Sequence, residues 1–159
     1  MSHLASGDID VKYGNLPEGQ DASVDATVQL MSEMAKGKFG ARSPMIRAAA
    51  INIIDGLDPL TGKRIGMPVD NKDYFGMVEA IHNYVRDNIR YVKDVIGQET
   101  LSYPEETLFN SRGGDCDDMT IVEMALLGSI GLRSYPVVIG LVPGHFSHVY
   151  LHAEIPPGK

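Results

Sequence analysis

The sequence predicts an α+β fold in which helices from the N-terminal half pack on a small antiparallel sheet near the C-terminus. Apolar residues recur at helical spacing through most of residues 24–130. After Gly131 the period changes to two, as in extended strands. The single cysteine, Cys116, stands just before the most apolar helical segment. These observations predict a core helix that begins at the cysteine and packs against the sheet.

Length and composition are those of one globular domain. The chain has 159 residues, enough to bury about two-thirds of its unfolded surface, and 43% are hydrophobic. The formal net charge of −7 argues against a nucleic-acid partner, because phosphate binding needs a clustered basic surface. No apolar run reaches the roughly 18 residues of a membrane span, and the start lacks the basic-then-apolar pattern of a signal peptide.

Residues 1–22 differ from the rest of the chain in composition. They are rich in Gly, Asp, Ser and Pro and show no sustained periodicity. We therefore expect a flexible N-terminal arm over 1–22 and one domain over 23–159. The first helix of that domain is expected at residues 24–36, ended by Gly37 and Gly40.

Two more helices are predicted before residue 91. Ser43 is a good N-cap followed by Pro44 at the first helical position, so a helix should run from there to about residue 55. The longest helix is expected at residues 73–90, after a loop rich in glycine and proline. His82 lies beside its apolar stripe, and we expect it to be a packing or surface residue.

A short helix precedes the cysteine helix. Ser102 and Glu105 have the spacing of a capping box, which predicts a helix over residues 104–110. In the following segment apolar residues recur at helical spacing through residues 119–130, and Gly131 stands where a left-handed cap residue would end the helix. Cys116 therefore falls in the first turn of a core helix.

Two strands are predicted after Gly131. Residues 133–142 are β-branched and apolar, which is typical of a strand buried on both faces. Pro143 and Gly144 signal a turn, and residues 146–155 alternate. The alternation puts Val149 on one face and His148 on the other. We expect an antiparallel hairpin packed against the cysteine helix.

Cys116 has the surroundings expected of a nucleophile. Two glycines precede it, and acidic residues surround it where a buried structural cysteine would have apolar neighbours. The amides and positive dipole end of a helix start stabilise a thiolate, so we expect a lowered pKa. The alternative is an inert cysteine that acts as a small buried hydrophobe.

His148 is the predicted partner of Cys116. A metal site built from His145, His148 and His152 is disfavoured, because four residues along a strand separate two rings by about 13 Å. A strand packed across the helix start would instead bring the His148 imidazole to the sulfur, where it could act as a base and later protonate a leaving group. The alternative is a histidine that merely occupies a sheet face. No cofactor and no metal are predicted.

Several motifs resemble one known family. They are Gly-Gly-Asp-Cys-Asp-Asp at residues 113–118, Ser-Ile-Gly-Leu-Arg at 129–133 and Phe-Ser-His-Val-Tyr at 146–150, with the upstream segment 78–92. Together they resemble the transglutaminase-like superfamily, and more narrowly the transglutaminase-like cysteine peptidases of tailed phages and prophages. The similarity extends over about residues 43–155.

The resemblance implies a papain-like arrangement of helices against an antiparallel sheet. It also implies Cys116 as nucleophile and His148 as base in acyl transfer at amides. Family members complete a triad with an Asp or Asn on the next strand, and the sequence given ends before that strand. Three explanations stay open: a fragment, a strand from a partner chain, or a fold that now serves binding. Asn110 or Gln98 could supply a second oxyanion donor beside the Cys116 amide.

The leading prediction is a cysteine-dependent acyl-transfer enzyme, either a peptidase or amidase or a transglutaminase-like enzyme, acting on a protein or peptide substrate. The alternative is a non-catalytic structural or interaction protein of a phage particle that retains the fold. The expected partners are the substrate and other phage structural proteins, with no nucleic acid. The expected location is the cytoplasm of a bacterial host or the phage virion.

Overall fold

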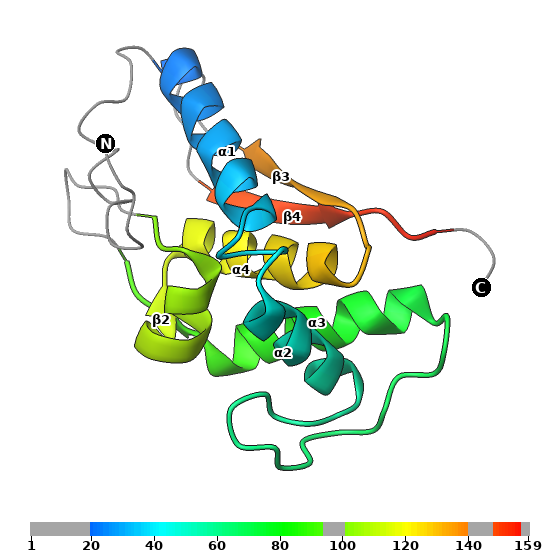
Figure 1. Cartoon of the computed structure of the whole chain (residues 1–159). Coiled ribbons are helices and arrows are strands. Elements are labelled where there is room, and N and C mark those ends of the chain that lie inside the picture. The colour runs from blue at the N-terminus through cyan, green and yellow to red at the C-terminus, as the bar shows by residue number, and fades with distance from the viewer. Residues whose placement is uncertain (1–19, 94–100, 140–147, 157–159) are drawn as a thin grey trace.

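The computed structural model describes residues 20–93, 101–139 and 148–156 (Figure 1). For residues 20–25 it describes the backbone only. In chain order the elements are α1 (Gln20–Lys36), α2 (Pro44–Ile54), α3 (Tyr74–Asn88), β1 (Arg90–Tyr91), a π-helical turn η2 (Glu106–Ser111), β2 (Gly113–Gly114), α4 (Cys116–Ser129), β3 (Ser134–Ile139) and β4 (His148–Ala153).

Helix α4 is the centre of the molecule. The β3–β4 hairpin covers one side of it and helices α2 and α3 cover the other, while α1 packs across its flank (Figure 1). Its residues from Thr120 to Leu127 are all buried. A helix that is apolar nearly all round needs neighbours on every side, and α4 has them. The predicted core helix is confirmed, and it begins at Cys116 itself.

The sheet beside α4 is an antiparallel hairpin. Its register pairs Ser134 with Ala153 and Ile139 with His148. Val149, which is 1% exposed, faces α4 and belongs to the same core as Leu126. A second, two-stranded sheet pairs β1 with β2 in parallel and ties the end of α3 to the residues just before Cys116. The mixed architecture agrees with the predicted α+β class.

The helix boundaries follow the caps that the sequence indicated. The Ser43 side chain accepts hydrogen bonds from the amides of Met45 and Ile46, and Pro44 opens α2. Gly131 takes a positive φ of 88°, which an L side chain would rarely adopt, and α4 ends just before it. Helix α1 begins at Gln20, earlier than residue 24, so the division into an arm and a domain stays a prediction.

The prediction that the first strand is buried on both faces is wrong. Tyr135 is 45% exposed and Ile139 is 43% exposed. The reason is that α4 covers one face of the hairpin, while Tyr135 stacks on His152 on the other face with ring centroids 4.9 Å apart. The apolar composition of β3 therefore does not require two covered faces.

The capping box expected at Ser102 and Glu105 is also wrong. The Ser102 amide donates to the carboxylate of Asp118 at 2.9 Å. The Glu105 carboxylate accepts a hydrogen bond from the hydroxyl of Ser43, 62 residues earlier. Both groups of the box are thus bonded to distant parts of the chain, and the segment forms the π-helical turn η2.

Some predictions fall outside the described residues. They concern most of the N-terminal arm, the turn at Pro143 and Gly144, and His145. Among the helices that the structure describes, none is long and apolar enough to cross a membrane.

Candidate active site

The start of α4 is fixed by a reciprocal cap. The Asp115 carboxylate accepts hydrogen bonds from the amides of Asp117 (3.1 Å) and Asp118 (3.2 Å). The Asp118 carboxylate accepts in return from the amide of Asp115 at 3.3 Å. This capping box satisfies amides that a helix start leaves without partners in the helix. The acids around Cys116 therefore hold the backbone that carries the thiol.

Gly114 is required by this cap. A Cβ atom at position 114 would lie 2.6 Å from the Cβ of Asp118, a distance that side chains do not tolerate. The residue is also buried, and its carbonyl accepts a hydrogen bond from the Val92 amide at 2.8 Å. The glycine lets β2 run close against the first turn of α4. It contributes to the position of Cys116 through the backbone.

Cys116 is half-buried under the start of β4. Its thiol donates a long hydrogen bond to Oδ1 of Asp117 at 3.9 Å. Burial raises the pKa of the thiol to about 11, and the carboxylates of Asp117 and Asp115 act in the same direction, whereas the Val149 amide lowers it. The prediction that the pKa of Cys116 is lowered is therefore wrong. The effects of burial and of the two carboxylates on this pKa are larger than that of the helix start.

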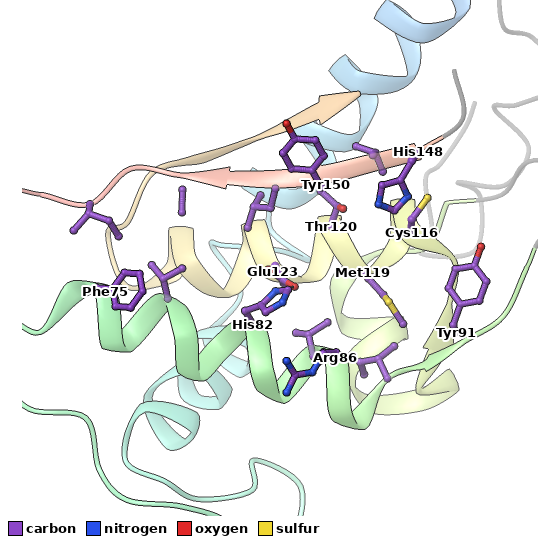
Figure 2. A pocket seen from close by; sticks show the side chains of 17 residues that line it. Phe75, His82, Arg86, Tyr91, Cys116, Met119, Thr120, Glu123, His148 and Tyr150 are labelled. Carbon is purple, nitrogen blue, oxygen red and sulfur yellow. The ribbon is translucent and has the colours of Figure 1, made fainter. Parts of the chain in front are cut away.

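His148 is the residue next to Val149 in β4, and it lines the same cavity as Cys116. Figure 2 shows the sulfur of Cys116 and the imidazole of His148 pointing toward each other at one end of that cavity. The strand packs across the helix start, as the sequence suggested, and so brings both predicted site residues together. His152 is not among the residues that line the cavity.

The cavity has a volume of about 720 Å³ and runs along α4 between α3 and β4. Its floor is the face of α4 on which Cys116, Thr120 and Glu123 follow one another. Apolar side chains form most of the two walls: Phe75, Val78, Val85 and Ile89 on the α3 side, and Val149, Leu151, Ala153 and Ile155 on the β4 side. It is large enough for a short peptide segment.

A second polar pair, which the sequence analysis missed, lies in the same cavity. The Nδ1 atom of His82 is 2.9 Å from the Oε1 atom of Glu123. The Glu123 side chain is only 10% exposed, whereas that of His82 is 54% exposed. Burial raises the pKa of the Glu123 carboxyl, and His82 opposes the shift. A signal was present in the sequence: Glu123 is the one charged residue within the apolar part of the core helix.

The sequence suggested Asn110 and Gln98 as second oxyanion donors, and the structure describes only the first of them. The Asn110 side chain donates to Glu106 at 2.9 Å on its own turn, and it does not line the cavity. Gln98 lies outside the described residues. Within the described ranges, no three His, Cys, Asp or Glu side chains are grouped so that they could hold a metal ion.

Comparison with known families matches most of the described chain to one family. The family model of the transglutaminase-like superfamily matches residues 65–156, more than half of the chain. The protein therefore belongs to the transglutaminase-like superfamily, whose members are generally cysteine-dependent acyltransferases or peptidases. Neither a curated protein nor a solved structure matches the chain significantly.

Proposed function

We propose that the protein is a cysteine-dependent acyl-transfer enzyme in which Cys116 is the nucleophile and His148 is the general base. The observation that carries the proposal is that the Cys116 sulfur and the His148 imidazole face each other at one end of the cavity (Figure 2). The start of β4 packs across the start of α4, which brings the two side chains to the same place. The substrate is an amide of a protein or peptide, and the cavity receives its acyl part.

The reaction proceeds in two acyl transfers. His148 takes the thiol proton of Cys116 as the sulfur attacks the carbonyl carbon, and a C–S bond forms. The C–N bond then breaks, and the imidazolium returns its proton to the leaving amine. Water hydrolyses the thioester in a peptidase, and a second amine attacks it in a transamidation. In both cases His148 takes the proton of the incoming group and the thiol is regenerated.

The raised pKa of Cys116 decides the resting form of this pair. With a thiol pKa of about 11, the resting state is a neutral thiol beside the imidazole. Proton transfer to His148 then accompanies the attack, and no thiolate–imidazolium pair is stored beforehand. The substrate, as it displaces water from the cavity, completes the geometry for that transfer.

The oxyanion of each tetrahedral intermediate binds at the start of α4. The Asp115 cap uses the amides of Asp117 and Asp118 but not that of Cys116. An amide at the positive end of a helix, adjacent to the nucleophile, is suited to a developing negative charge. We assign the Cys116 amide as the first oxyanion donor.

A third residue is needed to orient His148. Within the described residues, β4 pairs with β3 only, and its other edge can accept a further strand. We propose that an Asp or Asn on such a strand, from this chain or from a partner, approaches His148. Asp115 and Asp118 do not serve this purpose, because their carboxylates are engaged by the cap.

Burst kinetics with p-nitrophenyl acetate test the proposal. Acetyl transfer to Cys116 releases p-nitrophenol, and deacylation is the slower step, so the wild-type protein should show a burst of about one equivalent. Cys116→Ser should abolish the burst, while its melting temperature reports that the fold is kept. A burst of the same size in the folded Cys116→Ser protein would overturn the assignment of the nucleophile.

The alternative that we propose is a non-catalytic structural or interaction protein of a phage particle, and one observation favours the loss of catalysis in it. The pKa of Cys116 is raised, which is the direction expected of an unreactive buried thiol. In that case the wild-type protein should give no burst, and Cys116 should react with iodoacetamide no faster in the wild type than in His148→Ala.

A further inference from the structure

The proposed chemistry uses one end of the cavity and leaves the His82–Glu123 pair without a role. Glu123 lies seven residues after Cys116 on the same face of α4, which places it about 10 Å farther along the cavity. Figure 2 shows the pair between the Cys116 end and the apolar end at Phe75. An acyl substrate that lies along α4 from Cys116 must pass it.

The pair is built to present a carboxylate to the cavity. Glu123 is nine-tenths buried among apolar side chains, and burying a carboxylate is costly unless it is bonded. The hydrogen bond from His82 engages Oε1, one of its two oxygens. The bond also fixes the direction of the carboxylate, because α3 and α4 hold its two ends. Both side chains line the cavity, so the second oxygen can be reached from it.

The charge of the pair selects the ligand. An ionised Glu123 carboxylate beside a neutral imidazole gives the pair one negative charge. The other charged side chain that lines the cavity in the described residues is Arg86, which is bound to Asp87 at 2.9 Å on the surface. The formal net charge of −7 of the whole chain also attracts cations.

We propose that Glu123, held by His82, is a specificity-determining residue that binds an ammonium or guanidinium group of the acyl substrate. The cationic group lies about 10 Å from the carbonyl carbon that Cys116 attacks, near the full reach of an arginine-like side chain or of a lysine-like side chain on an adjacent residue of a peptide. The carboxylate accepts a charge-assisted hydrogen bond from it in a mostly apolar cavity. This inference rests on the proposed function for the location of the reacting carbonyl.

Two chloroacetamides of equal length test it. N-(5-aminopentyl)chloroacetamide carries an ammonium group on the order of 10 Å from its reactive carbon, as its bond lengths require. N-(5-hydroxypentyl)chloroacetamide is its neutral counterpart. With either probe the Cys116 sulfur forms a C–S bond, the C–Cl bond breaks and chloride leaves. The measured quantity is the ratio of the two second-order alkylation rates at pH 8.

The wild-type protein should alkylate about tenfold faster with the ammonium probe, the effect of one charge-assisted hydrogen bond. Glu123→Gln should bring the ratio to about one. Glu79→Gln is the matched control: it makes the same change of charge at an exposed position of α3 outside this cavity, and it should keep the ratio. A ratio near one in the wild type, or a preference kept by folded Glu123→Gln, would overturn the inference.

A measurement on the wild type guards against a misfolded variant. Pentylammonium should slow alkylation by the ammonium probe at concentrations where 1-pentanol does not, and equal protection by both would contradict the inference. If the proposed function itself is wrong, the alkylation rates give a different result. It would leave the rates of wild type and His148→Ala equal for each probe, whatever the ratio between the probes.

Discussion

Two pairs of side chains line the same cavity, each with a histidine on one wall and its partner on the α4 floor, and they are built differently. His82 and Glu123 bond directly through their side chains at 2.9 Å, from two packed helices. Cys116 and His148 are brought together by the packing of β4 across the start of α4 (Figure 2). The first pair has a carboxylate and no nucleophile, and the second has a nucleophile and no carboxylate.

The difference separates binding from chemistry. A side-chain pair that is already bonded stays in place when a ligand arrives, which suits recognition. The Cys116 thiol, with a pKa of about 11, has to give up its proton during the reaction. This suits a base such as His148, which lies close to the sulfur and does not need an ion pair with it beforehand. Substitutions at the two ends should therefore change different quantities.

The largest expected effect is at the chemical end. His148→Ala should lower the rate of the p-nitrophenyl acetate burst by about 10²–10⁴-fold, the usual contribution of a general base. The matched control is His152→Ala, four residues along the same strand and outside the cavity, which should keep the wild-type rate. Equal rates in wild type and His148→Ala would remove the histidine from the mechanism.

The next effect is on stability and tests how the cysteine is positioned. Gly114→Ala should lower the free energy of unfolding by about 1–3 kcal/mol, because its Cβ would meet Asp118 and disturb the cap. Gly66→Ala is the control, since a Cβ there meets nothing within 4 Å. Urea unfolding measures both variants. If Gly114→Ala is as stable as Gly66→Ala, the close approach of β2 to α4 is not needed.

The smallest effect is a pH dependence of stability. The pKa of Cys116 is raised from 9.0 to about 11 on folding, so between these values the folded state binds more protons than the unfolded state. The free energy of unfolding should therefore fall as the pH rises from 9 to 11. In Cys116→Ser the free energy of unfolding should fall less steeply over this range. Tyr84 and Tyr103 also have raised pKa values, but they contribute equally in both proteins. Identical slopes would argue that the thiol ionises freely in the folded protein.

Local signals in the sequence predicted much of the framework. The Ser43–Pro44 cap, the glycine at 131 and the alternation around Val149 each act within a few residues, and the structure keeps all three. From them follow the core helix, the hairpin and the common location of Cys116 and His148.

The features that sequence reasoning missed depend on contacts between distant residues. His82 and Glu123 are 41 positions apart, and Ser43 and Glu105 are 62 apart. The sign of the pKa shift of Cys116 depends on burial beneath β4, which no local pattern gives. A helix start does stabilise a thiolate, but burial has the larger effect on the pKa of Cys116.

The most direct test of the account is to isolate the acyl-enzyme. Wild-type protein and His148→Ala are mixed with p-nitrophenyl acetate at pH 7.5, quenched in acid within the burst and digested, and the acetylated fraction of the Cys116 peptide is measured by mass spectrometry. The account predicts that acetyl groups accumulate on Cys116 in the wild type and are nearly absent in His148→Ala at the same time point. Equal acetylation of Cys116 in both proteins, or a wild-type protein acetylated only elsewhere, would contradict it.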